Sequence, residues 1–450
     1  MRITRHFVEV DGRFVHYRRA GSGPPLLMVH QSPRSSAEYV PLMQEWGRRF
    51  TCIAPDTPGF GQSDPLHRPD ATIDDFGDAL VRLLDALGLA APVAAWGFHS
   101  GGIILMNLLR RHPGRLLRVA IGGYAIWTEA ERALFAGRYL PPLLPMPYGE
   151  HLTWLWNRML EQSWFFPWFA VDPAHRLPGA HDDVARVDQA VREMLDAGDA
   201  YRIGYGAVLA APRDVPPPEA TMPPVLITAY DGDPLQAHID RLGPMPAGWS
   251  AHKVSTPAEQ QALSLDFLSA DPGGAAPPVA ESARRGFAAV RTDLFEGLLH
   301  WRGAPGETAL VAAPGESAAL GTGAAIDPPG HGLSDDWTGP APATLGPWEA
   351  VLDSVSRQTG LVPRLPAASP GDAERLFPSL EPDRFGSHLT RAWAIVRAGR
   401  LFEPWYRADA AHARPFDPQH LDPARLAVAH LARLQARGAR AWWQVLGTRA

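Results

Sequence analysis

Short apolar runs alternate with stretches of helical periodicity along the first 268 residues of the chain. The apolar runs fall within 26–33, 51–64, 91–96 and 224–234, and most of them lead directly into a loop. Runs of this length suit buried parallel strands, whereas the stretch at 101–111 suits a helix. The alternation therefore predicts an α/β fold with a mainly parallel sheet.

The turn between the third of these strands and the helix has glycine at Gly97 and Gly101, two positions on either side of His99. A strand-to-helix turn as tight as a nucleophile elbow needs small residues at these two places, because larger side chains would collide there. With Ser100 at the tip, the Phe98 ring would have to fit into that space. The sequence therefore predicts His99 at the tip.

An imidazole at this place can act as a general base or as a nucleophile, because its pKa is near neutral pH. One alternative is a structural role, in which His99 lines a pocket and is hydrogen-bonded to His30, Ser32 or water. In another, a looser turn brings the Ser100 hydroxyl into the pocket.

Four motifs resemble those of the α/β-hydrolase superfamily over residues 6–268. They are Gly97-Phe98-His99-Ser100-Gly101-Gly102, His30-Gln31-Ser32-Pro33, Asp56-Thr57-Pro58-Gly59-Phe60-Gly61-Gln62-Ser63-Asp64 and Tyr230-Asp231-Gly232-Asp233-Pro234. The resemblance implies an α/β-hydrolase fold with a mainly parallel sheet and a helical cap.

The same resemblance implies an oxyanion hole that includes His30, Gln31, Ser32 and Ser100. The backbone N–H groups of Ser32 and Ser100 would be its donors. Gln31 replaces the glycine that is usual in the family, so its side chain is expected to narrow the pocket or to supply an amide donor. His30 is expected to brace the loop.

The acid of the family's catalytic triad corresponds to Asp233, with Asp231 as the second candidate. The histidine of that triad is missing, because Thr256-Pro257-Ala258-Glu259-Gln260-Gln261 stands where the family's histidine loop is expected. In the family the acid acts through this histidine. Asp233 is therefore expected to reach His99 only through water or His252.

The cap is expected at about 130–211 and is rich in aromatic residues. Trp154, Trp156, Trp164 and Trp168 are expected to line a pocket for an apolar or aromatic small molecule, since such rings give a large contact area. The alternative is that they only pack the cap against the core.

When the chain is compared with itself at a shift of 237 positions, the cap matches the C-terminal region without a gap. Gly149, His151, Leu152, Thr153, Trp156, Phe165, Pro167, Trp168, Asp172, Ala174 and His175 fall on Gly386, His388, Leu389, Thr390, Trp393, Phe402, Pro404, Trp405, Asp409, Ala411 and His412. Residues 284–450 are therefore predicted to be a degenerate partial copy with a duplicated cap. A linker at 270–283 would join this copy to an α/β-hydrolase domain at 1–269.

The predicted copy has no Gly-x-x-x-Gly turn, so it is expected to lack an active site. Its expected role is structural: it would pack on the first domain as an internal pseudo-dimer, or the protein would form a homo-oligomer through the cap.

Composition narrows the functional classes. The formal net charge is −6 and the arginines are scattered, which argues against nucleic-acid binding. The only cysteine is Cys52, and the 17 histidines show no metal-ligand spacing, so neither a metal nor a cofactor is expected. No long apolar run and no leader-like start at Met1 are present, so a cytoplasmic location without membrane contact is expected.

The sequence thus predicts an enzyme that acts on a small apolar ester, lactone or activated C–C bond through His99. One alternative is a pseudo-hydrolase that binds a ligand or acts as a scaffold without turnover. The other is a serine hydrolase that uses Ser100 with a recruited histidine such as His252.

Overall fold

The computed structural model describes residues 1–178, 183–213, 215–367 and 371–448, and the chain divides into two compact units. The N-terminal unit consists of Met1–Leu143 and Asn157–Glu281, and the C-terminal unit consists of Leu144–Trp156 and Ser282–Ala450. The division at residue 281 falls within the predicted linker. The grouping of Leu144–Trp156 with the C-terminal unit differs from the sequence-based assignment, which placed this segment in the cap of the first domain.

The elements up to Ser269 belong to the N-terminal unit, except that the first part of α5 lies in the C-terminal unit. In chain order they are β1 (Thr4–Val10), β2 (Arg13–Ala20), β3 (Pro25–Val29), the 3₁₀ helix η1 (Ser36–Tyr39), α1 (Val40–Trp46), β4 (Thr51–Pro55), α2 (Ile73–Ala86), β5 (Val93–Phe98), α3 (Ser100–Arg111), η2 (Pro113–Arg115), β6 (Leu116–Gly122), α4 (Glu129–Phe135), α5 (Glu150–Gln162), η3 (Pro173–His175), α6 (Val184–Ala197), η4 (Gly198–Ala200), α7 (Tyr201–Ala210), β7 (Val225–Tyr230), η5 (Gln236–Arg241), β8 (Trp249–Val254) and α8 (Pro257–Ser269).

Within the described part of this unit, eight strands form one sheet in the order β1-β2-β4-β3-β5-β6-β7-β8. β2 runs antiparallel to β1 and to β4, and the pairs from β4 to β8 are parallel. The predicted α/β fold with a mainly parallel sheet is confirmed. Parallel strands end at one edge of the sheet, so the loops after β3, β5 and β7 meet there.

The sheet is buried on both faces, which explains why its strands are continuous apolar runs. In β5, Val93 and Ala95 pack in a core cluster with α2 and α3, whereas Ala94 and Trp96 pack in a second cluster with α1 and α8. Cys52 lies in this second cluster, where burial raises the pKa of its thiol to about 12. The thiol is therefore a small core side chain.

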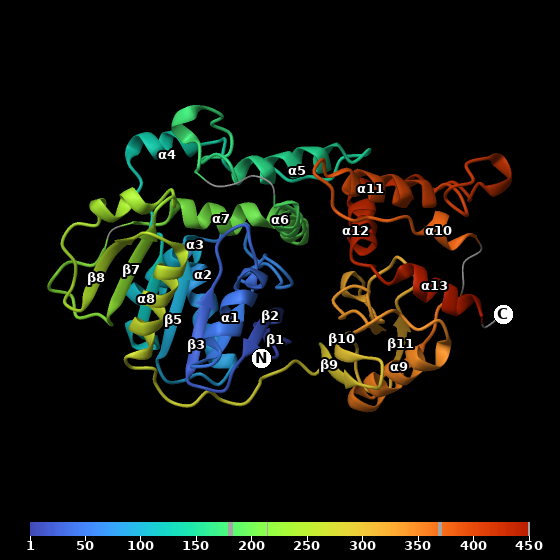
Figure 1. Cartoon of the computed structure of the whole chain (residues 1–450), viewed down its shortest axis with the longest axis horizontal. Helices are drawn as coiled ribbons and strands as arrows, with labels where there is room; N and C mark the ends of the chain where they lie inside the picture. The colour runs from blue at the N-terminus through green and yellow to red at the C-terminus, as the bar shows by residue number, and fades with distance from the viewer. Residues whose placement is uncertain (179–182, 214, 368–370, 449–450) are drawn as a thin grey trace. The chain divides into compact units, whose positions relative to one another are not determined.

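The helices α4, α6 and α7 lie over one end of the sheet (Figure 1). α7 contacts both α2 and α3, which places it beside the turn that follows β5. These helices fall inside the 130–211 segment that was predicted to form a cap, apart from the first residue of α4.

The C-terminal unit contains a second, smaller sheet. Its elements after residue 281 are β9 (Arg285–Arg291), β10 (Glu296–Arg302), β11 (Thr308–Val311), η6 (Ala318–Leu320), β12 (Ala325–Ile326), α9 (Leu345–Thr359), β13 (Val362–Arg364), α10 (Ala373–Leu376), α11 (Ser387–Gly399), η7 (Ala410–His412), η8 (Pro418–Leu421), α12 (Pro423–Leu434) and α13 (Ala439–Gly447).

Among the described residues of this unit, five strands pair in the order β9-β10-β12-β11-β13. This is the order β1-β2-β4-β3-β5 of the first sheet, and each pair has the same parallel or antiparallel orientation as its counterpart. No described element of the C-terminal unit stands in the place of α1, α3 or β6.

The helices after the second sheet match those before β7 in position. α11 begins and ends 237 positions after α5, and η7 does the same relative to η3. α12 and α13 end 237 positions after α6 and α7. Among the described residues, no helix is both long and apolar enough to cross a membrane.

Candidate functional site

His99 occupies the tip of the turn between β5 and α3, with φ 45° and ψ −109°. The turn leaves no space for side chains at the flanking glycines. A Cβ at Gly97 would lie 2.7 Å from the Gly101 carbonyl carbon, and a Cβ at Gly101 would lie 1.9 Å from the Val29 oxygen. Ser100 is the first residue of α3 and is buried. The structure therefore places the imidazole, and not the Ser100 hydroxyl, at the tip.

The His99 side chain contacts Asp233 directly. Its Nε2 lies 3.1 Å from both carboxylate oxygens. The His99 side chain is 22% exposed, whereas that of Asp233 is fully buried. The expectation that water or His252 bridges the two groups is wrong, and His252 lies exposed on β8. Asp231, the second candidate acid, is exposed and accepts a hydrogen bond from Gln236.

Direct contact is possible because position 123, at the end of β6, is glycine. A Cβ there would lie 2.5 Å from His99 Cδ2 and 3.0 Å from Asp233 Oδ2. The loop after β7 fixes the carboxylate, because the Leu235 backbone N–H donates to Asp233 Oδ1 at 2.8 Å. The Phe98 ring stacks on the imidazole at a centroid distance of 4.1 Å. The space at Gly123, the Leu235 N–H and the Phe98 ring together fix the geometry of the His99–Asp233 pair, which is called the dyad below.

These contacts settle the charge of the acid. Burial acts most strongly on Asp233 and by itself raises the pKa of its carboxyl. The His99 imidazole and the Leu235 N–H outweigh burial, so the pKa of Asp233 is lowered. Asp233 is therefore ionised at neutral pH, and a carboxylate only accepts hydrogen bonds. His99 must then carry its proton on Nε2, which in the neutral ring leaves Nδ1 with a free electron pair.

A small cavity of about 40 Å³ opens at His99. Its walls are mainly aromatic and aliphatic, with Arg213 and two tyrosines as the polar members besides His99 and Ser100. The lining residues are His99, Ser100, Ile103, Ala125, Trp127, Phe135, Tyr139, Phe166, Tyr205, Val208, Leu209, Arg213 and Leu235. The Tyr139 and Tyr205 hydroxyls lie 3.1 Å apart.

The four tryptophans that were predicted to line this cavity do not line it. Trp154 and Trp156 belong to the C-terminal unit, where the Trp156 indole donates to the Arg384 carbonyl. The Trp168 indole donates to the Tyr139 carbonyl, and its ring stacks with the Arg158 guanidinium. Trp156 and Trp168 thus make their contacts within their own units, whereas the alternative from the sequence was packing of the cap against the core of the first domain.

Of the predicted oxyanion residues, only Ser100 lines the cavity at His99. His30 is buried, and its Nε2 accepts from the Thr57 N–H at 2.9 Å while its Nδ1 donates to the Gln31 carbonyl. His30 therefore braces the loop after β3. Ser32 is buried in the same loop.

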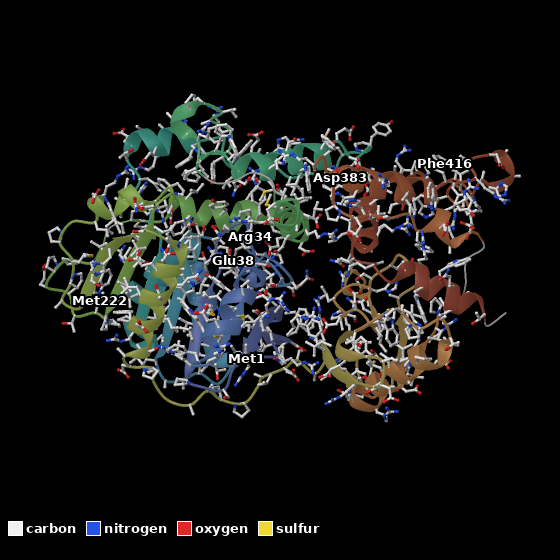
Figure 2. The ribbon with its side chains drawn as sticks, viewed as in Figure 1. Met1, Arg34, Glu38, Met222, Asp383 and Phe416 are labelled. Atoms are coloured by element: carbon white, nitrogen blue, oxygen red, sulfur yellow. The ribbon has the colours of Figure 1, made fainter. Side chains whose placement is uncertain are left out.

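Gln31 faces away from the dyad. Its backbone N–H and its side-chain amide both donate to Glu38, at 2.7 and 3.0 Å. Together with Arg34 and Glu38 (Figure 2) it lines a separate polar cavity of about 430 Å³ on the Phe98 side of the turn. The prediction that Gln31 narrows the active pocket is therefore wrong.

Asp56, at the start of the loop after β4, joins a buried network with His16. His16 Nδ1 lies 2.8 Å from Asp56 Oδ2, and Asp56 also accepts from the backbone N–H groups of Ser36 and Gln62. The Ser63 hydroxyl donates to the Asp56 carbonyl at 2.8 Å. Burial lowers the pKa of His16 to about 4, so its ring is neutral at neutral pH. The network holds the loops after β3 and β4 together.

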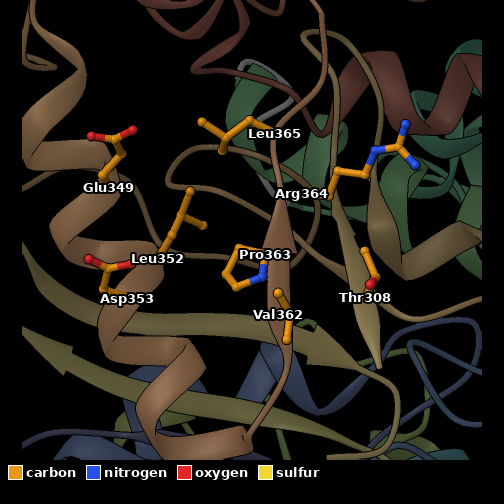
Figure 3. A pocket seen from close by; sticks show the side chains of 8 residues that line it. All are labelled: Thr308, Glu349, Leu352, Asp353, Val362, Pro363, Arg364 and Leu365. Atoms are coloured by element: carbon orange, nitrogen blue, oxygen red, sulfur yellow. The ribbon is translucent and has the colours of Figure 1, made fainter. Parts of the chain in front are cut away.

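The C-terminal unit has a cavity of its own, of about 630 Å³ (Figure 3). It is lined by Thr308, Glu349, Leu352, Asp353, Val362, Pro363, Arg364 and Leu365. It lies between α9 and β13, the counterparts of α2 and β5. In the N-terminal unit α3 packs against both of those elements. No described helix of the C-terminal unit fills the corresponding space between α9 and β13.

Sequence reasoning missed Tyr139, Tyr205 and Arg213. Tyr139 lies in the segment after α4, and Tyr205 is on α7. Arg213 follows α7 in a stretch without periodicity, so no local pattern distinguishes it from the exposed arginines of the chain. Only the tertiary structure brings these residues to His99.

Residues 24–139 match the sequence model of the family described as alpha/beta hydrolase fold. This match, together with the order of the strands in the first sheet, supports an α/β-hydrolase fold for the N-terminal unit. The chain is 34% identical over 124 residues to a cis-3-alkyl-4-alkyloxetan-2-one decarboxylase of Shewanella oneidensis, which covers 26% of this chain and 38% of that protein. It is 30% identical over 146 residues to haloalkane dehalogenase 2 of Mycobacterium tuberculosis, covering 32% of this chain and 50% of that protein.

The chain thus spans half or less of the length of these curated relatives. Among solved structures, a mutant epoxide hydrolase of Vigna radiata aligns with 60% of this chain and 99% of its own chain, at 17% identity and a TM-score of 0.47.

Proposed function

We propose that the N-terminal unit is an enzyme that hydrolyses a small apolar ester or lactone, with His99 as general base and Asp233 as the group that orients it. The observation that carries this proposal is the direct contact between the His99 Nε2 and the buried Asp233 carboxylate. In serine hydrolases a carboxylate holds the catalytic imidazole in one tautomer and stabilises its protonated form. Here the carboxylate holds the imidazole at the elbow itself.

The proposed reaction needs no serine or cysteine nucleophile. His99 Nδ1 takes a proton from a water molecule while the water oxygen attacks the carbonyl carbon of the ester. The negative charge on the carbonyl oxygen is then held by the backbone N–H of Ser100, at the N-terminus of α3. When the intermediate collapses, the C–O bond to the alcohol breaks and the imidazolium returns the proton to the leaving oxygen. The products are a carboxylic acid and an alcohol.

The cavity walls support an apolar substrate. Trp127, Phe135 and Phe166 are three of its lining residues, and they offer large contact areas without hydrogen-bonding demands. The name of the Shewanella oneidensis relative includes an oxetan-2-one, which is a lactone. That relative is a decarboxylase, so cleavage of an activated C–C bond is kept as a variant of the proposal.

Turnover of p-nitrophenyl acetate, p-nitrophenyl butyrate and a set of lactones would test the proposal on the full chain. We expect His99→Ala and Asp233→Asn each to lower kcat/KM by about 10²–10⁴-fold, because a positioned general base contributes about that much. Ser100→Ala should keep most of the activity, because only its backbone N–H is assigned a role. The matched control is His252→Ala, which removes an exposed imidazole from β8.

Equal rates in the wild type, His99→Ala and Asp233→Asn would overturn the proposal. Loss of activity in Ser100→Ala alone would point to the serine hydrolase that the sequence left open.

The second candidate function is a ligand-binding protein without turnover. The observation that favours it is the size of the cavity, since 40 Å³ is small for a substrate and a water molecule together. Saturable binding of an ester or its acid without any product would support this candidate.

We also propose that the C-terminal unit is a degenerate copy of the N-terminal α/β layer together with its cap. The shared strand order, the shared strand orientations and the 237-position match of α5 with α11 support this proposal. Its role would be structural, because its sequence has no Gly-x-x-x-Gly turn.

Reciprocal contacts within the C-terminal unit support an internal pseudo-dimer. The Trp156 indole donates to the Arg384 carbonyl, and the Trp393 indole donates to the Pro147 carbonyl. Trp393 follows Trp156 by 237 positions, and Arg384 follows Pro147 by the same number. The ring contacts are reciprocal in the same way, since Trp156 packs on His388 and His151 packs on Trp393. In a two-fold interface residue i contacts j while j contacts i. This is the pattern that two identical caps would make in a homodimer.

A further inference from the structure

Arg213 is a buried charge in the wall of the cavity at His99. It is 7% exposed, and its Nη2 donates to the Val208 carbonyl at the end of α7. Its Nε and Nη1 are also buried and have no acceptor among the described residues. A guanidinium has five N–H donors and no acceptor. Two of its nitrogens therefore have no acceptor in the part of the chain that the structure describes.

The neighbours of Arg213 do not neutralise it. Tyr124 and Tyr205 are phenols, and Arg132 adds a second positive charge nearby. Burial lowers the pKa of Arg213 to about 10, which still leaves it protonated at neutral pH. Burying a charge without a partner is costly, so such groups in proteins are normally paired.

Two other buried arginines of the same unit give a comparison. Arg34 forms an ion pair with Glu193. Arg158 also has two buried nitrogens without a hydrogen-bond partner among the described residues, but it stacks on the rings of Trp168 and Tyr201 and donates to Gln162. Arg213 has neither a carboxylate nor a stacked ring among the described residues, and it is the arginine that lines the cavity.

We propose that this cavity binds a compact apolar molecule that carries one carboxylate group, with the carboxylate on Arg213 and the apolar part among Trp127, Phe135 and Phe166. A single guanidinium without a carboxylate partner among the described residues neutralises a monoanion, whereas it would leave the second charge of a phosphate monoester unpaired. This carboxylate site would belong to the active site of the proposed function. It rests on that function for one point only, which is that the reacting bond of the bound molecule faces His99.

Benzoate and its uncharged isostere benzamide provide the test. Their binding to the full chain would be measured by isothermal titration calorimetry in a buffer without carboxylates. We expect benzoate to bind the wild type at least tenfold more tightly than benzamide. A charge-assisted hydrogen bond of about 1.5–3 kcal/mol corresponds to roughly ten- to hundredfold in Kd. Arg213→Gln should remove this preference.

Arg158→Gln is the matched control, because it also removes a buried guanidinium of this unit but one outside the cavity. It should keep the preference for benzoate. Equal binding of benzoate and benzamide to the wild type would overturn the inference even if Arg213→Gln does not fold. An unchanged preference in a folded Arg213→Gln variant would overturn it as well.

Binding and turnover are separate readouts, so the two proposals fail separately. A preference for benzoate without turnover of any ester would leave the carboxylate site in place and remove the proposed hydrolysis. Turnover of esters without a preference for benzoate would remove the carboxylate site alone.

Discussion

Each of the two sheets of this chain carries the same buried network after its fourth strand, but an elbow turn is found only with the first sheet in the described part of the chain. In the N-terminal unit the network joins His16, Asp56 and Ser63. In the C-terminal unit His300 Nδ1 lies 2.9 Å from Asp327 Oδ2, and the Ser334 hydroxyl donates to the Asp327 carbonyl at 2.6 Å. His300 and Asp327 are fully buried, as their counterparts nearly are.

The difference separates the requirements of folding from those of chemistry. The described residues of the C-terminal unit include no elbow turn, no helix like α3 and no loop like the one after β7, and yet they contain the same histidine–aspartate pair. This pair therefore serves the strand-and-loop framework and not a reaction. His99 and Asp233 have no counterpart among those residues. The dyad can therefore be altered without altering what both units share.

The largest effect is expected from breaking the shared network. His16→Ala and His300→Ala each leave a buried carboxylate without one of its donors, which we expect to cost about 2–4 kcal/mol of unfolding free energy. Urea unfolding measures the loss, and hydrogen exchange locates it in the unit that carries the substitution. The exposed His252→Ala should change stability by less than about 0.5 kcal/mol. A loss for His16→Ala with none for His300→Ala would show that the second network is not structural.

A smaller, pH-dependent effect is expected where the two networks differ. Position 60 is phenylalanine, whereas its counterpart His331 is a fully buried histidine whose Nε2 has no partner among the described residues. Burial lowers the pKa of His331 to about 4, whereas the unfolded chain titrates near 6.5. Between these values the unfolded state binds a proton that the folded state does not, so stability falls as the pH drops from about 6.5 to about 4.

His331→Phe should remove this part of the acid sensitivity. The unfolding free energy of the variant minus that of the wild type should be about 2 kcal/mol larger at pH 4.5 than at pH 7.5. The pKa shift of a buried histidine gives this magnitude. Unfolding curves at the two pH values give the comparison. The same difference at both pH values would contradict the prediction.

The smallest effect tests the reciprocal contacts of the proposed pseudo-dimer. Trp156→Phe and Trp393→Phe each remove one indole-to-carbonyl hydrogen bond, which we expect to cost about 1 kcal/mol and nearly equal amounts in the two variants. Trp154→Phe on the same helix is the control, since its counterpart 237 positions later is Arg391. Losses that differ by more than about 1 kcal/mol would argue against equivalent environments, and a thermal melt series suffices to detect this.

The sequence was sufficient for the fold because burial on both faces of a parallel sheet leaves continuous apolar runs between helices. It was also sufficient to place His99 at the turn, since the steric demand of the turn acts on Gly97 and Gly101 directly. Asp233 was found from the loop that follows β7. These features depend on neighbours along the chain, which a sequence displays.

Other features depend on contacts between distant residues. The direct contact between His99 and Asp233 requires a residue without a side chain at Gly123, which directly follows the third strand involved, β6. Gln31 was assigned to the pocket, but the nearby Glu38 binds both of its donors. The tryptophans of α5 were assigned to the cavity because their number is conspicuous, yet the start of that helix packs in the C-terminal unit.

The glycine at position 123 sets a limit on how this chain can change. A single methyl group there would push the imidazole off its carboxylate, so even alanine, the mildest replacement elsewhere in a strand end, would uncouple the two ionisable groups. The tautomer of the ring would then be free to exchange. A position with no side chain of its own thus controls which ring nitrogen of His99 holds the proton.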